Sequence, residues 1–255
     1  MTGENPGTAT PPAATRRRLR IAGLAVFSVC LAAYLASSRP ASLVHGWDTL
    51  GTRVVPFALL RDHRVTLDSF AAEFSRDPRP IGYLENRRGH LVSHYPIGPA
   101  IVALPLDAPL YAALRILGKT SPRDVFSAAE KAAGPSASVI AALSVVVLFF
   151  LLSESAGLGV AACVSLAFGL GTSMWAIARR ELWEHGPDAL FLLLGYRFLS
   201  RPRFRPRDVA LAGACLGLLF GIRPAAGIFA AAGFAAAVWR EPGIRKRARA
   251  AAAFA

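Results

Sequence analysis

Three short stretches of this chain carry the side chains best suited to chemistry. They are residues 45–53 with Asp48, residues 179–188 with Glu184, and residues 221–224 with Arg223. A carboxylate can act as a general base that takes a proton from an attacking hydroxyl. A guanidinium held between two helix ends suits bidentate binding of a phosphate. These residue types indicate proton transfer and anion binding.

Asp48 and Arg223 also have plain structural interpretations. Asp48 could cap a helix that starts at Thr49, because Asp is favoured at such positions. Arg223 could extend along apolar surface and place its charge in water. Both interpretations stay open beside the chemical ones.

The second stretch is unusually dense in ionisable groups, with Trp183, Glu184 and His185 at its centre. Such groups are costly near lipid and usually face a cavity at the mouth of a helical bundle. The alternative is an interfacial belt in which Trp183 is an anchor and Arg179 pairs with Glu184. We expect Trp183, Glu184 and His185 to be site candidates.

A further group in the first half comprises His90, His94 and Tyr95. Two histidines four residues apart can ligate a metal when they lie on a helix, but Pro96 and Pro99 disfavour helix here. We therefore predict no zinc site. The competing interpretation is packing at the membrane interface, with Tyr95 at the level of the lipid headgroups.

The elements that must position these groups follow from composition. The chain has 255 residues, of which 54% are hydrophobic and 18% charged, whereas soluble domains average about 25% charged. The apolar residues form long blocks, which excludes disorder, a collagen-like chain and an ordinary cytosolic enzyme. The blocks are residues 21–37, 97–117, 136–152, 156–178, 187–199, 209–222 and 224–239. We expect an all-α membrane protein: a multispanning helical bundle whose long first external loop contains juxtamembrane helices.

The net charge of +13 indicates orientation in a membrane rather than nucleic-acid binding. Arg clusters at 16–20, 201–207 and 245–249 each adjoin an apolar block, where positive charge marks the inner side. Cys30, Cys163 and Cys215 lie inside apolar blocks, and we expect them to pack rather than bind metal.

The block 97–117 carries Pro99, Pro105, Pro109 and Asp107, so a simple span is disfavoured and a broken juxtamembrane or re-entrant helix is expected. Without this crossing, the inner segments hold 14 Lys/Arg and 4 acidic residues, and the outer ones hold 15 and 12. The positive-inside rule is then satisfied. All five histidines fall outside.

This topology implies a disordered cytoplasmic tail at 1–15 and a transmembrane domain at 16–255, with an external loop at about 40–135. The amino terminus is expected inside, at the plasma (inner) membrane. A cleavable signal peptide is the alternative for the first block. Residues 209–239 predict a tight hairpin whose tip, 221–224, faces outward. A new apolar run starts at 250–255, which predicts a truncated chain.

Three patterns carry a resemblance to a known family. They are Trp47-Asp48-Thr49 together with Tyr95-Pro96-Ile97-Gly98-Pro99-Ala100; Leu182-Trp183-Glu184-His185-Gly186-Pro187; and Leu211-Ala212-Gly213 through Gly221-Ile222-Arg223-Pro224. In this order, over roughly residues 20–240, the chain resembles the amino-terminal half of the GT-C superfamily of polytopic membrane glycosyltransferases. Within that superfamily it is similar to the protein O-mannosyltransferase-like and lipopolysaccharide-sugar-transferase-like branch.

The resemblance implies transfer of a sugar, with inversion, from a polyprenyl-phosphate donor on the outer face of the membrane. It matches Asp48 to the base, and Arg223 to a basic residue before proline. It matches Glu184 or His185 to an acid or histidine in the second external loop, at about 179–188. Arg53 is a second candidate for the donor phosphate. Many relatives carry paired acids where this chain has Asp48 and Thr49, so a divalent metal stays open.

The expected partners are the lipid bilayer, the lipid-linked donor and a glycan, lipid or protein acceptor, and no nucleic acid. Two other classes compete. A transporter or flippase for a lipid-linked or anionic substrate would also use a broken helix and a buried Arg, but the sequence contains no evident internal repeat. A non-catalytic membrane scaffold is the third class.

Overall fold

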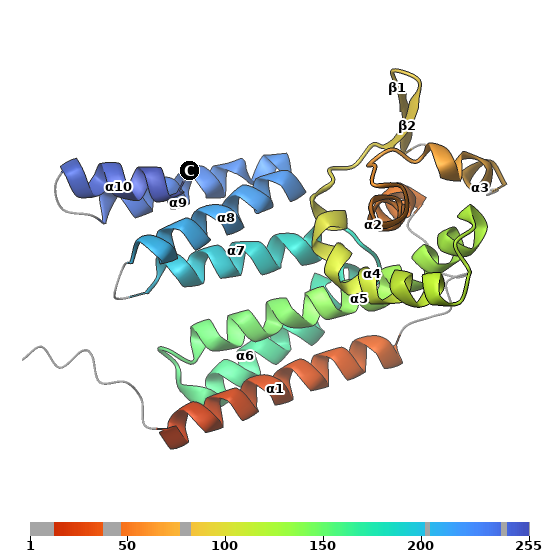
Figure 1. Ribbon diagram of the computed structural model, residues 1–255. Coiled ribbons are helices and arrows are strands. Elements are labelled where there is room, and N and C mark those ends of the chain that lie inside the picture. Colours follow the sequence, from red (N-terminus) through yellow and green to blue (C-terminus); the bar gives the residue numbers. More distant parts are fainter. Residues whose placement is uncertain (1–12, 38–46, 77–82, 202–204, 241–243, 255) are drawn as a thin grey trace, which may run out of the picture.

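The computed structural model describes residues 13–37, 47–76, 83–201, 205–240 and 244–254, and it is predominantly α-helical (Figure 1). Six helices run roughly parallel to one another: α1 (Ala13–Ala36), α5 (Pro122–Leu152), α6 (Gly157–Gly171), α7 (His185–Leu199), α8 (Pro206–Ile222) and α9 (Gly227–Trp239). At one end of them lie α2 (Leu50–Asp62), α3 (Ala71–Arg76), α4 (Gly98–Ile116) and an antiparallel hairpin of β1 (Leu84–Arg87) and β2 (His90–Ser93). A last helix, α10 (Ile244–Phe254), packs on α8 and α9.

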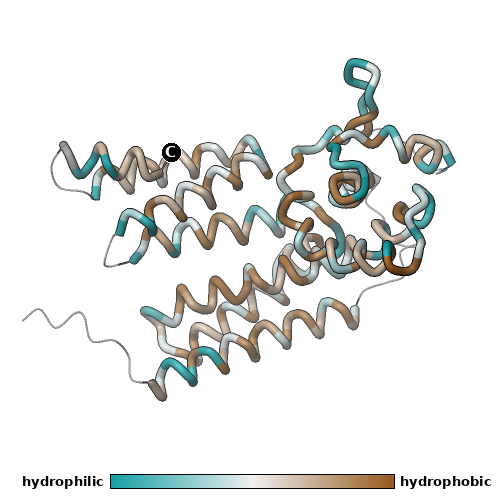
Figure 2. Tube along the Cα trace, in the orientation of Figure 1, coloured by the Kyte–Doolittle hydropathy of each residue, from teal (hydrophilic) through white to brown (hydrophobic). Residues whose placement is uncertain are grey.

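Three of the described helices are long and apolar enough to cross a membrane: α1, α4 and α5, with mean hydropathies of 2.0, 1.3 and 2.4. The shorter apolar segments Gly157–Gly171 and Pro224–Trp239 accompany them. Figure 2 shows hydrophobic residues along the parallel helices and hydrophilic ones at the start of α1 and around the turn from α7 to α8. The all-α fold expected from the sequence is confirmed, and the apolar helices fit a membrane protein.

The expected break in the block 97–117 is wrong, because α4 is one continuous helix that runs through Pro105 and Pro109. Asp107 was one reason to expect a break, because a carboxylate inside a membrane is costly. The Asp107 carboxylate is buried and accepts a hydrogen bond of 2.6 Å from the hydroxyl of Ser136 on α5. A buried polar group costs much less when it is hydrogen-bonded. Helix α4 lies with α2 at one end of the parallel helices (Figure 1), which keeps the juxtamembrane interpretation as a prediction.

Small residues let the helices approach closely. A Cβ on Gly169 of α6 would lie 2.8 Å from Val145 and 3.1 Å from Cys30, and the Tyr34 hydroxyl donates a hydrogen bond of 2.8 Å to the Gly169 carbonyl. Small residues at such contacts are typical of helices packed in membranes. Cys30 and Cys215 are buried as expected, whereas Cys163 is exposed on α6.

The Arg-rich segments gather at the end of the bundle away from α2. Arg201 pairs with Asp208 at 2.6 Å, and Arg197 pairs with Glu154 at 2.9 Å. The Arg240 guanidinium donates to the Leu199 carbonyl. These contacts join the ends of α5, α7, α8 and α9, as expected for loops that share one side of the bundle.

Three boundaries differ from expectation. Helix α1 starts at Ala13, inside the tail predicted to be disordered at 1–15, and residues 1–12 lie outside the described residues. The block 136–152 is the second half of a helix that starts at Pro122, where Ser121 caps it by accepting from the Asp124 amide. The run predicted to start at 250–255 belongs to α10, which already begins at Ile244.

Candidate functional site

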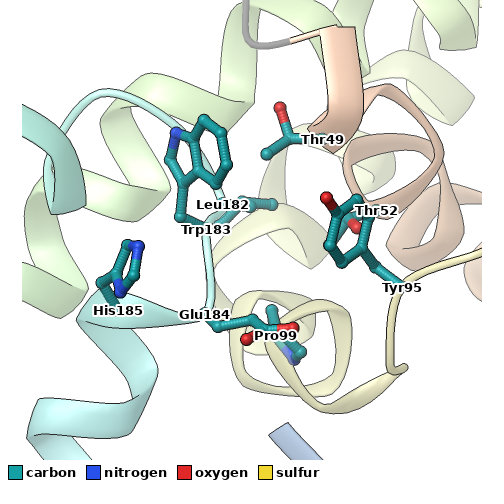
Figure 3. A pocket seen from close by; sticks show the side chains of 8 residues that line it. All are labelled: Thr49, Thr52, Tyr95, Pro99, Leu182, Trp183, Glu184 and His185. Atoms are coloured by element: carbon teal, nitrogen blue, oxygen red, sulfur yellow. The ribbon is translucent and has the colours of Figure 1, made fainter. Parts of the chain in front are cut away.

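Two of the three stretches singled out in the sequence, 45–53 and 179–188, line a cavity of about 120 Å³ at one end of the bundle. Arg223, from the third stretch, does not line the cavity but pairs with Glu184, which does. The cavity walls come from the start of α2, the link from β2 to α4, and the loop before α7 (Figure 3). The lining residues are Thr49, Thr52, Tyr95, Pro99, Leu182, Trp183, Glu184 and His185. Figure 3 shows Trp183 and His185 on one side of the cavity, with Thr52 and Tyr95 on the other.

Helix α2 supports the first wall because its inner face is apolar. Val54, Phe57 and Ala58 are fully buried, and α2 packs on α4 and α5. A short 3-10 turn, Trp47–Thr49, leads into the helix. Asp48 lies in this turn, one residue before the N-cap, which is Thr49. The burial of this face fixes the position of Asp48 at the end of the bundle.

Arg179 anchors the second wall. Its guanidinium donates hydrogen bonds of 3.0 and 3.2 Å to the Tyr34 and Ser37 carbonyls at the end of α1, where helix carbonyls lack intrahelical partners. The Arg179 carbonyl accepts 3.0 Å from the Ser138 hydroxyl. The alternative pairing of Arg179 with Glu184 is therefore not formed, and the loop is tied to α1 and α5 instead.

The carboxylate of Asp48 is partly withdrawn from solvent. Its Oδ1 is buried and accepts no hydrogen bond from the described residues. Burial raises the pKa of Asp48, while hydrogen bonds from its own and the Thr49 backbone, the positive charge of Arg53 and a hydrogen bond from Tyr95 oppose the rise. Tyr95 lines the cavity, so it connects Asp48 to that space. One Asp48 oxygen therefore has no hydrogen-bond partner among the described residues.

Glu184, which lines the cavity, pairs with Arg223. Arg223 Nε lies 3.7 Å from Glu184 Oε2, and Nη1 lies 3.6 Å from Asp188 Oδ2 on the first turn of α7. Burial and the negative charge of Asp188 raise the pKa of Glu184, and Arg223 opposes this. The Arg223 side chain is 47% exposed. Its cation is therefore held loosely enough to accept another anion.

Arg223 is positioned by the end of α8. The helix stops at Ile222, and Arg223 adopts an extended backbone before Pro224 starts the next short turn. Gly98 at the start of α4 lies against this end, because a Cβ there would stand 2.6 Å from the Ile222 Cα. The hairpin tip predicted at 221–224 thus faces the second loop and the first.

Arg53 does not line the cavity, contrary to its expected place beside the donor phosphate. Its side chain is fully buried and its Nε lies 2.8 Å from Glu181 Oε2. Its Nε and Nη2 also donate to the Thr49 hydroxyl, at 3.1 and 2.9 Å. The sequence could not show this, because Glu181 comes from the second loop.

His90 and His94 lie on and just beyond strand β2, and neither lines the cavity. His90 Nδ1 is 2.8 Å from Asp68 Oδ2, and His94 Nδ1 contacts Glu85. Of this group only Tyr95 reaches the cavity, where its ring stacks on Tyr83 at 5.5 Å between centroids. Within the described ranges no three His, Cys, Asp or Glu residues are close enough to hold a metal ion. The described residues do not fit a divalent metal held by protein ligands alone.

Sequence reasoning did not select Thr52, Glu181 or Asp188. The two acids belong to the dense stretch 179–188, so that density was a usable signal for them. Thr52 carries no local signal, because a threonine on an apolar helix is most often a packing residue. Its position on the wall depends on which face of α2 points to the cavity.

Together these observations define a class: a predominantly α-helical chain with helices fit to cross a membrane and a cavity, walled by three separate segments, at one end of its helical bundle. Comparison of the chain with protein-family models, with curated proteins and with solved structures finds no match.

Proposed function

We propose that this protein is an integral-membrane glycosyltransferase that moves a sugar from a polyprenyl-phosphate donor to an acceptor hydroxyl, with inversion. The observation that supports this best is the grouping of Asp48, Glu184 and Arg223, from three segments, beside one cavity: Glu184 lines it, Asp48 bonds to the lining residue Tyr95, and Arg223 pairs with Glu184. Displacement of a lipid phosphate from a sugar needs a base for the acceptor hydroxyl and positive charge on the leaving phosphate.

In this reaction the acceptor oxygen attacks the anomeric carbon, and the bond from that carbon to the phosphate oxygen breaks. The acceptor proton goes to Asp48, and the electron pair of the broken bond stays on the leaving phosphate. General-base assistance typically contributes about 10²- to 10⁴-fold in rate. Arg223, which pairs with the cavity residue Glu184, is the cation we assign to stabilise the negative charge that develops on the phosphate.

The cavity suits the sugar rather than the lipid. At about 120 Å³ it is smaller than the roughly 300 Å³ or more that holds a drug-sized ligand. The rings of Trp183 and His185, at 27° to one another with centroids 6.3 Å apart, line the cavity, and an aromatic ring suits packing against one face of a sugar ring. Thr52 and Glu184 offer a hydroxyl and a carboxylate as partners for its hydroxyl groups. The polyprenyl chain would stay in the bilayer beside the helices.

The proposed sidedness follows from the charge distribution. The cavity, the five histidines and most acidic residues face outward, the Arg-rich ends face the cytoplasm, and the amino terminus is cytoplasmic in the plasma (inner) membrane. Helix α4 then lies at the outer surface instead of crossing. This arrangement obeys the positive-inside rule and puts the cavity where a lipid-linked donor presents its headgroup.

The proposal is tested with the purified chain in detergent and in vesicles, using a panel of polyprenyl-phosphate sugars. Transfer of labelled sugar to an acceptor supports it. Movement of the labelled lipid across vesicles without transfer would instead indicate a transporter or flippase. The absence of both activities would indicate a scaffold.

A further inference from the structure

The first and second loops are joined beneath the cavity by one buried ion pair. Arg53 comes from α2 and Glu181 from the loop before α7, and their Nε and Oε2 atoms are 2.8 Å apart. The Arg53 side chain is 0% exposed and that of Glu181 8%. Both loops also pack on other elements. Among the described residues, this ion pair is a direct charged contact between the two cavity walls.

Thr49 turns the pair into a three-residue network. Its hydroxyl accepts from Arg53 Nε and Nη2, at 3.1 and 2.9 Å, and lies 3.5 Å from Glu181 Oε2. Thr49 itself lines the cavity. It is also the residue after Asp48, while Glu181 precedes Glu184 by less than one helical turn. Movement at the network therefore moves both acids.

A buried ion pair is poor evidence of a stabilising role. Taking two charges out of water costs about as much as their attraction returns, and a well-packed apolar pair is often equally stable. A planar guanidinium is, however, a rigid fork that fixes the angles of the groups it binds. Such a network fixes the relative positions of the segments it joins more than it raises the free energy of unfolding.

We propose that Arg53 and Glu181 are positioning residues, which hold the two cavity walls, and with them Asp48 and Glu184, at the separation that sugar transfer requires. The inference rests on the proposed function for its catalytic consequence. The role of Arg53 thereby changes: the sequence predicted contact with the donor phosphate, whereas here Arg53 holds Thr49 and Glu181 in place.

The test replaces both charges at once, as Arg53→Met/Glu181→Leu. Either single substitution would leave one buried charge uncompensated and is expected to unfold the protein, whereas the double variant keeps an apolar pair of similar volume. The matched control is Arg197→Met/Glu154→Leu, which removes an Arg–Glu pair of 2.9 Å at the other end of the bundle. Arg53→Lys is added as a conservative variant, since it keeps the charge but loses the fork.

Two readouts are measured on the full chain in detergent: steady-state transfer from a polyprenyl-phosphate sugar, and backbone hydrogen exchange. For the double variant we expect kcat to fall about 10²-fold, as for a misplacement near 1 Å, with donor KM within about threefold. Exchange in peptides covering 47–53 and 179–184 should quicken on the order of tenfold while the helices keep their protection. For Arg53→Lys we expect kcat and exchange rates between those of the wild type and the double variant. The control should match the wild type in both readouts.

Wild-type kcat together with unchanged exchange in the double variant would overturn the inference. So would faster exchange across all helices, because the pair would then be an ordinary structural contact. A wild-type protein that transfers no sugar would refute the proposed function on its own. The exchange experiment would still decide whether the pair positions the walls.

Discussion

Arg223 Nε lies 3.7 Å from Glu184 Oε2, so the end of α8 meets the loop that precedes α7. Since Glu184 lines the cavity and Arg223 is half exposed beside it, the contact places a cation at the rim of the cavity. An anionic group of a ligand in the cavity would compete with Glu184 for that cation.

The first prediction concerns the base. Asp48→Asn should lower the rate of sugar transfer by about 10²- to 10⁴-fold while donor affinity stays within a few-fold, because the amide is nearly isosteric but accepts no proton. Single-turnover transfer and donor titration measure the two quantities. Asp62→Asn, on the last turn of α2, is the control and should behave as the wild type. Full turnover by Asp48→Asn would reduce Asp48 to a structural residue of the 3-10 turn.

The second prediction concerns Arg223. Arg223→Lys should weaken donor binding because the ammonium lacks the bidentate fork, and Arg223→Ala should weaken it further, by about 1.5 to 3 kcal/mol, as for a hydrogen bond to a charged group. The expected loss is moderate because Arg223 is 47% exposed rather than in a dry cavity. Titration of a polyprenyl-phosphate sugar checks it, with exposed Arg207 at the other end of α8 as the control. Equal affinities for all variants would remove Arg223 from the site.

The third prediction is a pH dependence. The Asp48 carboxylate accepts the proton, so activity is present above its pKa and lost as pH falls through it. Burial raises that pKa, so kcat/KM should start to fall at a higher pH than for an exposed Asp. Tyr95→Phe removes a hydrogen bond that lowers the pKa, and should move the acid limb of the profile upward. Tyr83→Phe should leave it in place, and a profile independent of both Tyr95 and Asp48 would contradict the assignment.

The fourth prediction tests the contact between α4 and α8. A Cβ on Gly98 would lie 2.6 Å from the backbone of Ile222, so Gly98→Ala should push apart the segment that carries Tyr95 and the one that carries Arg223. Overpacking of this kind costs about 1 to 3 kcal/mol, and donor binding should weaken with it. Gly217→Ala meets no neighbouring atom and should be neutral or slightly stabilising. Thermal unfolding separates the two variants, and equal melting temperatures would refute the predicted clash.

The fifth prediction concerns topology. In a chain whose native cysteines are replaced by alanine, Arg64→Cys and Ala225→Cys should react with an impermeant maleimide added to intact cells. Glu154→Cys and Arg207→Cys should react only after permeabilisation, because the positive-inside rule places their loops in the cytoplasm. All four positions are exposed. The reverse pattern would invert the protein in the membrane and put the cavity on the cytoplasmic face.

Much of the helical framework could be predicted from the sequence, because a long apolar block is a local property. In lipid, the backbone N–H and C=O groups of such a block must hydrogen-bond to one another, which favours a helix. The blocks at 156–178, 187–199 and 209–222 correspond to α6 with its π-helical extension, α7 and α8. The turn at 221–224 was likewise predictable, since Arg223 and Pro224 interrupt an apolar run. Three of the site stretches stood out for the same reason: ionisable groups beside apolar blocks are costly unless they serve a purpose.

The partners of those groups depended on the tertiary structure alone. The residues around Asp107 in the sequence do not indicate that Ser136 is its partner. The Ser136 hydroxyl donates a hydrogen bond that lowers the cost of burying the Asp107 carboxylate in α4. Arg53 similarly gained a role from Glu181, a residue of another loop. Hydrogen bonds and ion pairs act over about 3 to 4 Å and require particular directions, so they are decided by how distant segments pack. The sequence shows where burying a polar group would cost free energy, whereas the packing of the helices determines which partner offsets that cost.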